Sequence, residues 1–312
     1  MILFFKKIYF YFFDLCIYYI LILSQLSYRR PIFIITIPYG RWGNRLILYS
    51  YIIAWANKYN CIVMNPSFSE YSYSFSHFKN NPLCLLSANY NFCLYIFKLF
   101  SNIFQNSLKR TTLRSSNLPS LYKIDLENKF VNTDTIDFPK ILSSKRIIFF
   151  YGFLFGDRDF SLINNQRKYL SHLFLFSDHI KKKCIEIIKL INKKKVIGVC
   201  MRQGDYKDYS KGNFFLSDSD YQNLVSRLQI QYPDHGFFIA CEEEKNDFQI
   251  NNTFISYQNP ALNLCVLSYC DILIGPPSTF MTWAAFYRDS AVCYIDKFTW
   301  DRQHYTFTPV TF

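Results

Sequence analysis

The sequence predicts an α/β fold with parallel sheets, organised as two domains. Short apolar runs rich in β-branched residues alternate with stretches of helical periodicity, as in strand–helix–strand units. The chain has 312 residues, of which 50% are hydrophobic and 20% aromatic. That is enough chain and enough apolar surface for two packed cores.

The first domain is expected over residues 31–165. Its first strand, IFIITI, is followed by the glycine-containing loop PYGRWGN and then by a helical pattern. Most of the segment 65–145 is polar and aromatic and predicts loops, with one helix-like piece near residues 92–104. The expected strands of this domain are residues 32–37, 61–64 and 146–153, and its expected helix is residues 45–59.

The second domain is expected over residues 166–312. A helical stretch at residues 160–195 leads into it, and strands and helices then alternate more clearly than in the first half. This alternation predicts a compact, doubly wound parallel sheet. The expected strands are residues 196–201, 236–241, 253–256, 271–274 and 291–295, and the expected helices are residues 218–231, 262–269 and 278–287.

Residues 1–30 form a separate hydrophobic segment in the sequence. Its apolar part, residues 8–23, is shorter than the roughly twenty residues that span a bilayer, contains Asp14, and has no good signal-peptide cleavage site. Basic pairs at both ends favour a helix that lies in the membrane interface. An extra helix packed on the first domain and a spanning anchor are the alternatives. We therefore expect a cytoplasmic protein, with peripheral contact to the inner face of a membrane as one option.

The formal net charge of +12 lies partly in two lysine runs, residues 181–183 and 193–195. Between residues 178 and 195, four isoleucines follow helical spacing, which predicts that the lysines form the solvated face of one helix. Attraction to phosphate, in nucleic acid, anionic lipid or a nucleotide, is the alternative. No nucleic-acid-binding motif is present, and we expect no nucleic-acid partner. The isoleucines are Ile180, Ile185, Ile188 and Ile191.

The ten cysteines contain no Cys-x-x-Cys pair, and several lie inside apolar runs that are predicted strands. This distribution is typical of small buried side chains in a reducing compartment. It favours neither a disulfide framework nor a zinc site.

Three unusual stretches each follow a predicted strand: GRWGN, RQGDY and GPPSTF. In open α/β sheets, ligands bind beyond the carboxyl ends of the strands. In the third stretch, Ser278 or Thr279 is expected to cap a helix after a Gly-Pro-Pro turn, and a helix start attracts anions such as phosphate. Arg202, at the end of another strand, could bind the same phosphate through its forked guanidinium group.

Taken together, GRWGNRLILYSYIIAWA, VCMRQGDY and DILIGPPSTFMTWAAFY resemble, in order and spacing, the motifs of the alpha-1,2-fucosyltransferase family. They are also similar to those of its wider superfamily of alpha-1,6- and protein O-fucosyltransferases. The resemblance runs from about residue 32 to residue 295. It implies a GT-B-like fold, in which two Rossmann-like domains face a cleft, and a donor site mainly in the second domain.

The resemblance also implies the reaction. Fucose would pass from GDP-fucose to a glycan hydroxyl with inversion and without a metal ion, in alpha-1,2 linkage to a terminal galactose. The expected partners are therefore a nucleotide-sugar donor and a glycan acceptor, and no cofactor is expected.

For the donor site, the resemblance assigns residues in all three stretches. Arg202 falls on the signature arginine of the family's His-x-Arg-Arg-Gly-Asp-Tyr motif and would neutralise the diphosphate as the sugar–oxygen bond breaks. Gly204 would make the turn that follows it. Ser278 and Thr279 would hold the phosphates at the helix start. The loop of the first domain would approach the diphosphate with Gly40, Arg41, Gly43 and Asn44.

The candidate catalytic residues are Arg202, Asp205 and Asn44. An inverting transfer usually needs a general base for the acceptor hydroxyl, and Asp205 is the candidate chosen. It could instead fix the geometry of its loop. Three further carboxylates stay open as bases: Glu70, Asp157 and Asp159.

Two positions depart from the family motif: Cys200 replaces its histidine and Gln203 its second arginine. Because the family's histidine supports the nucleotide base, Cys200 is retained as a donor-binding candidate. The family's acidic pair aligns with Glu242 and Glu243, which could accept hydrogen bonds from guanine N–H groups. The alternative is that they are exposed loop acids.

Other function classes stay open. A metal-dependent transferase would use an Asp-x-Asp motif, and residues 157–159 and 218–220 both match it, although the second lies where a helix cap is expected. A non-catalytic relative that binds nucleotide or glycan would explain the two departures at Cys200 and Gln203.

Overall fold

The computed structural model of the chain describes residues 30–35, 39–65, 68–78, 121–125, 136–144, 147–152, 161–245, 250, 252–257 and 259–310. The chain forms two compact units. Unit 1 comprises Met1–Arg41 and Leu48–Gln166, and unit 2 comprises Trp42–Ile47 and Arg167–Phe312. The helix α2 (Trp42–Lys58) is thus divided between them, so the expected boundaries at residues 31–165 and 166–312 stay predictions.

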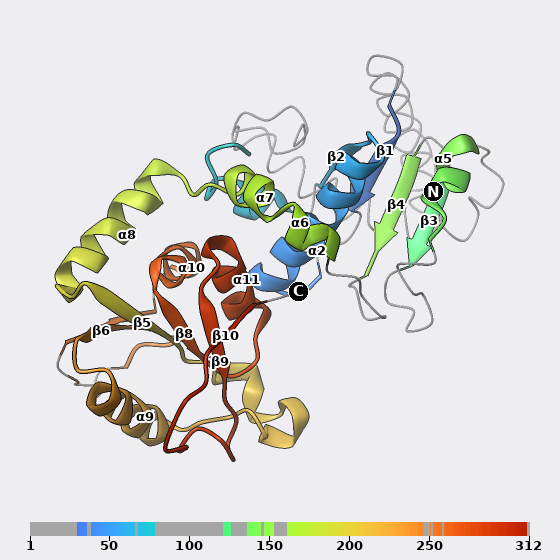
Figure 1. Cartoon of the computed structure of the whole chain (residues 1–312). Coiled ribbons are helices and arrows are strands. Elements are labelled where there is room, and N and C mark those ends of the chain that lie inside the picture. Colours follow the sequence, from blue (N-terminus) through green and yellow to red (C-terminus); the bar gives the residue numbers. More distant parts are fainter. Residues whose placement is uncertain are drawn as a thin grey trace, which may run out of the picture. The chain divides into compact units, whose positions relative to one another are not determined.

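Unit 1 contains a four-stranded, fully parallel sheet in the order β2-β1-β4-β3 (Figure 1). Its strands are β1 (Ile32–Ile35), β2 (Ile62–Met64), β3 (Leu121–Asp125) and β4 (Ile147–Tyr151). Its helices besides α2 are α3 (Ser69–Ser72), α5 (Phe138–Ser144) and α6 (Ser161–Asn165).

Aromatic side chains form much of the core of unit 1. The ring of Trp55 on α2 lies 5.2 Å from that of Phe138 on α5 and 5.9 Å from that of Phe150 on β4. Phe33 on β1 lies 5.1 Å from Phe150. Burial of these large rings stabilises the packing of the two helices on the sheet.

Unit 2 contains a six-stranded sheet in the order β10-β9-β8-β5-β6-β7, parallel except for β10. The helices α8, α10 and α11 cover one face, and α9 covers the other (Figure 1). The strands are β5 (Lys195–Cys200), β6 (His235–Ala240), β7 (Thr253–Ser256), β8 (Ile272–Gly275), β9 (Ala291–Tyr294) and β10 (Thr308–Pro309). The helices are α7 (Arg167–Leu173), α8 (Asp178–Ile191), α9 (Asp218–Gln231), α10 (Pro260–Tyr269) and α11 (Thr279–Arg288).

The α/β fold with parallel sheets is confirmed, and the strands and helices of unit 2 lie close to their predicted residues. Three elements of unit 1 are corrections: α3, β3 and α5 lie in the segment expected to be loop. β3 is an edge strand with the sequence LYKID, and an edge strand needs no continuous apolar run. The expected cleft between the two domains stays a prediction.

The lysine-rich helix is shorter than predicted. The expected helical stretch 160–195 is divided into α6, α7 and α8, and α8 ends at Ile191 because Asn192 adopts a left-handed conformation with φ 52°. The second lysine run therefore lies in the turn after α8 and at the start of β5.

The buried face of α8 also differs from the prediction. It consists of Ile180, Cys184, Ile187 and Ile191, whereas Ile185 is 45% exposed. The buried positions follow i, i+4, i+7 and i+11, the regular stripe of one helix face. The lysines at positions 182 and 183 are exposed, as expected for a solvated face.

Several predictions fall on residues outside the described ranges: the hydrophobic segment 8–23, the helix near 92–104, and Asp157 with Asp159. Within the described ranges, no helix is both long and apolar enough to pass through a bilayer.

We predict that Ile187→Ala lowers the free energy of unfolding by about 2–5 kcal/mol, because it leaves a cavity under α8. The matched variant Ile185→Ala, on the same helix, should change it by less than about 1 kcal/mol. Urea unfolding of the two variants measures the difference. Equal losses would show that the buried face of α8 is assigned wrongly.

Candidate functional site

The candidate site in unit 2 lies at the carboxyl ends of β5 and β8. From β5 the chain proceeds through β6 to β7 in one direction, whereas β8 and β9 lie on the other side of β5. The order of the strands therefore reverses between β5 and β8. In doubly wound sheets this switch point is where ligands bind.

Arg202 follows β5 at this point, and its guanidinium group is held by two carboxylates. Nη1 donates to Oε1 of Glu242 at 2.6 Å, and Nη2 lies 2.9 Å from Oδ1 of Asp205. The ring of Tyr206 lies 5.3 Å from Cζ, and the backbone N–H of Arg202 donates to the hydroxyl of Tyr221 at 3.1 Å. Within the described residues, Nε is buried without a hydrogen-bond partner.

The electrostatic balance around Arg202 favours its charged form. Burial alone would lower the pKa of Arg202, but the carboxylates of Glu242 and Asp205 raise it, and the net result is a pKa above the ordinary value. The guanidinium group therefore stays protonated. Its side chain is only 19% exposed, so an incoming anion would meet it partly desolvated and would exchange with the carboxylates.

The start of α11 supplies the second part of the site. Ser278 is the N-cap, and its Oγ accepts a hydrogen bond from the N–H of Met281 at 3.2 Å. Sγ of Cys200, at the end of β5, lies 3.9 Å from this Oγ. Burial raises the pKa of Cys200 to about 11, so its side chain is a neutral thiol at physiological pH.

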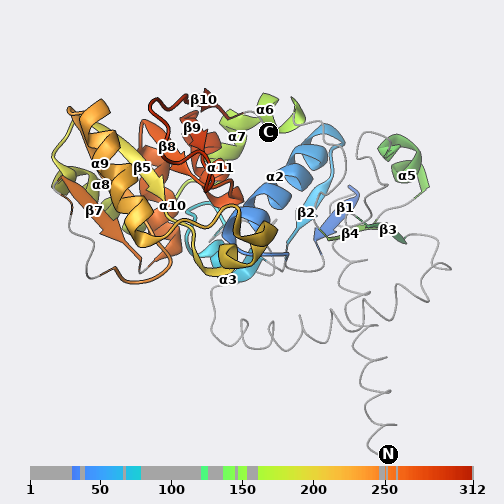
Figure 2. The ribbon, with the colours of Figure 1, turned by 90° about the horizontal axis from the view of Figure 1, so that it is seen from below.

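The first turn of α2, grouped with unit 2, lies beside the start of α11 (Figure 2). Oγ1 of Thr279 donates to Oδ1 of Asn44 at 2.6 Å. A Cβ atom on Gly43 would lie 2.4 Å from the backbone N of Phe280, so only glycine allows this approach.

The loop after Arg202 is fixed to the turn before α11. The hydroxyl of Tyr206 donates to the carbonyl oxygen of Pro277 at 2.5 Å. A Cβ atom on Gly204 would lie 2.8 Å from Oε2 of Glu242, so this glycine leaves room for the carboxylate that binds Arg202. The hydrogen bond of Tyr206 thus connects the loop after β5 with the turn after β8.

The structure thus brings most of the predicted site residues of unit 2 together. The carboxylate of Glu242 accepts a hydrogen bond from Arg202, and its expected contact with guanine stays a prediction. The neighbouring residue Glu243 is exposed. Asp205 is ion-paired with Arg202 and 53% exposed, which leaves both of its suggested roles open. Gly40 and Arg41 belong to unit 1, and Gly40 has a φ of 63°, which favours glycine. Their approach to the diphosphate stays a prediction.

The Asp-x-Asp motif at residues 218–220 stabilises the start of α9. Ser217 is the N-cap, which corrects the cap expected within the motif, and Asp220 completes a capping box with it. Asp218 accepts hydrogen bonds from Gln203 and Lys245. Among the described residues, no group of three or more His, Cys, Asp or Glu side chains is placed to hold a metal ion.

Four residues with contacts at this site were not assigned from the sequence: Gln203, Tyr206, Tyr221 and Lys245. Gln203 and Tyr206 lie in RQGDY, so their position in this motif could have identified them as site residues. For Tyr221 and Lys245 the sequence contains no such signal, because their contacts depend on how the strands are ordered.

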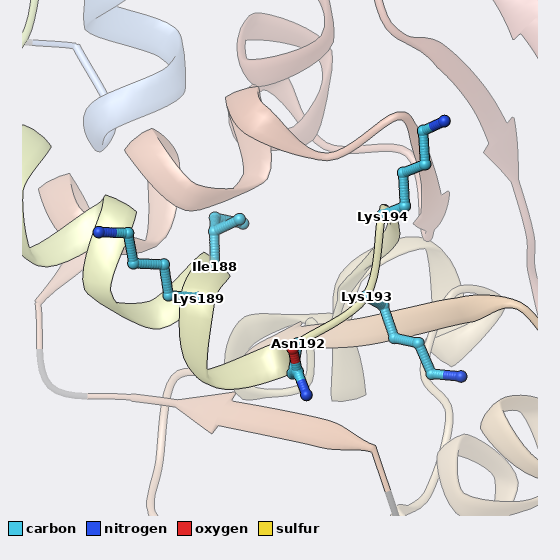
Figure 3. Close-up of a pocket in the computed structure, with 5 residues that line it drawn as sticks. All are labelled: Ile188, Lys189, Asn192, Lys193 and Lys194. Atoms are coloured by element: carbon cyan, nitrogen blue, oxygen red, sulfur yellow. The ribbon is translucent and has the colours of Figure 1, made fainter.

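A second basic region lies at the end of α8. A hollow there is lined by Ile188, Lys189, Asn192, Lys193 and Lys194, and the three ammonium groups point in different directions (Figure 3). They do not converge on one point where an anion could bind. This arrangement fits lysines that are simply solvated.

Comparisons with known proteins support the architecture. No family model and no curated protein matches the chain. The fucosyltransferase NodZ from Bradyrhizobium is similar in structure over 90% of this chain and 99% of its own, with a TM-score of 0.54 and 12% identity. NodZ alpha-1,6-fucosyltransferase soaked with GDP-fucose has a TM-score of 0.52 over the same coverage and identity.

FUT1 of Arabidopsis thaliana, an arginine-to-lysine mutant in complex with GDP, matches 85% of this chain and 70% of its own, with 12% identity and a TM-score of 0.52. At these identities the similarity concerns the fold. The chain therefore has the α/β fold with parallel sheets that is found in GT-B fucosyltransferase structures.

We predict that Gly43→Ala lowers the free energy of unfolding by about 1–3 kcal/mol, because the methyl group would overlap the backbone of α11. At a helix position without close neighbours, Gly→Ala would raise the free energy of unfolding by up to about 1 kcal/mol. The sign of the change therefore distinguishes a crowded position from an open one. Urea unfolding measures it. A stabilised Gly43→Ala protein would mean that α2 and α11 do not approach each other in this way.

Proposed function

We propose that the chain is an inverting, metal-independent glycosyltransferase that moves fucose from GDP-fucose to a glycan hydroxyl. The observation that supports this most strongly is that Arg202 follows β5 and α11 begins after the neighbouring strand β8, both at the switch point of unit 2. A guanidinium group and a helix start are two complementary binders of a diphosphate.

The chemistry follows from charge. When the bond between fucose and the diphosphate oxygen breaks, negative charge develops on the leaving phosphate. Arg202 would stabilise that charge if phosphate oxygens replaced the carboxylates of Glu242 and Asp205 around its guanidinium group. The N–H groups at the start of α11 would share the charge.

The acceptor and its linkage rest on the sequence resemblance alone. We propose a terminal galactose as acceptor and an alpha-1,2 linkage. We also propose that the protein acts in the cytoplasm, at the inner face of a membrane, which rests on the basic and apolar pattern of residues 1–30.

The test of the donor is to incubate the full chain with a panel of nucleotide sugars in the presence of EDTA and to measure the release of free nucleotide. The expected result is that GDP-fucose is cleaved faster than every other donor. Loss of activity with EDTA would favour the metal-dependent alternative. Binding of GDP without any cleavage would favour a non-catalytic relative, and equal cleavage of all donors would contradict the proposed donor.

We predict that Arg202→Ala lowers kcat by about 10²–10³-fold or more, because the leaving phosphate loses its main charge partner. Arg167→Ala is the matched control, since Arg167 also pairs with a carboxylate, Asp289, which caps the far end of α11. The control should keep normal turnover. Circular dichroism should show that both variants are folded. Near-normal turnover of Arg202→Ala would show that Arg202 is not part of the catalytic site.

A further inference from the structure

A second hydrogen-bond network begins at Gln203, the residue that follows Arg202. The side-chain amide of Gln203 donates to the carbonyl oxygen of Leu216 at 2.9 Å and to Oδ1 of Asp218 at 2.7 Å. Nζ of Lys245 donates to Oδ1 of the same aspartate at 3.0 Å and lies 3.1 Å from its Oδ2. Gln203 and Lys245 therefore share one carboxylate.

This shared carboxylate joins three segments that are separate in the sequence. Gln203 belongs to the loop after β5, Asp218 begins α9, and Lys245 belongs to the loop after β6. Arg202 precedes Gln203 directly, and Glu242 stands on the same loop as Lys245. The network thus fixes both loops that carry the Arg202–Glu242 pair.

Charge and burial favour the pairing of Lys245 with Asp218, whose side chain is 51% exposed. Gln203 is neutral, so it cannot balance the charge of Asp218, whereas the ammonium group of Lys245 can. The side chain of Lys245 is only 11% exposed, and a charged group removed from water in this way needs a charged partner. Burial alone would raise the pKa of Asp218, but the hydrogen bonds from Gln203 and Lys245 lower it overall, so the carboxylate is ionised at neutral pH.

We propose that Lys245 is a positioning residue for the donor diphosphate: through Asp218 and Gln203 it fixes the direction of Arg202 toward the phosphate site. This inference rests on the proposed function. It predicts that Lys245 affects the binding of phosphate without touching phosphate itself.

The test compares GDP with guanosine, which has the same base and ribose but no phosphate. In Lys245→Met, a change that removes the charge and keeps the length, the affinity for GDP measured by calorimetry should fall by about tenfold or more. The affinity for guanosine, measured by NMR titration, should stay the same. Lys189→Met, on the exposed part of α8, is the matched control and should bind both ligands normally.

A rescue variant separates positioning from simple destabilisation. In the double variant Gln203→Arg with Lys245→Met, the new guanidinium group can donate to both Leu216 and Asp218 and restores the lost charge. We expect it to recover most of the affinity for GDP. If Lys245→Met does not fold, Asp218→Asn, which removes the carboxylate charge at the centre of the network, takes its place in the comparison of GDP with guanosine.

Three outcomes would overturn the inference. Unchanged affinity of Lys245→Met for GDP would show that Lys245 has no part in donor binding. Equal losses for GDP and guanosine, or no rescue by Gln203→Arg, would show only a structural role. If the unmodified protein binds no GDP at all, the proposed function fails first, and this result is distinct from the other three.

Discussion

The site depends on one interaction, the pairing of the Arg202 guanidinium group with Glu242 and Asp205 at the end of β5. A cation that is only 19% exposed loses much of its hydration, and the two carboxylates compensate for that loss. Neighbouring residues support this pairing of Arg202 with the two carboxylates. Gly204 leaves room for the Glu242 carboxylate. The hydroxyl of Tyr221 accepts a hydrogen bond from the backbone N–H of Arg202. Because both acids hold the guanidinium group, an anion that approaches its Nη atoms competes with carboxylate oxygens.

The sheet of unit 2 determines where this interaction occurs. Reversal of strand order between β5 and β8 leaves room at their carboxyl ends, and α11 begins there with Ser278 as its cap. The contact of Gly43 with the start of α11 adds the first turn of α2 to the same place. Small residues and a helix cap therefore position the start of α11 and the first turn of α2, whereas side-chain hydrogen bonds also fix the loops after β5 and β6.

Much of this arrangement can be predicted from the sequence, because strands buried on both faces are continuous apolar runs and the motif residues follow them directly. Edge strand β3 could not be predicted, since LYKID lacks such a run. The buried face of α8 was also predicted wrongly: its isoleucines fit several helix faces, and the face that is buried in the structure contains Cys184. Lys245 could not be found either, because its partner lies 27 residues away in the sequence and only the order of β5 and β6 brings the two together.

A crystal structure of the chain with GDP bound would show whether Arg202 and the start of α11 hold the diphosphate. We predict that the diphosphate lies between the guanidinium group of Arg202 and the start of α11, with at least one of the two carboxylates released from Arg202. A diphosphate bound elsewhere, with Arg202 still paired to both Glu242 and Asp205, would contradict it.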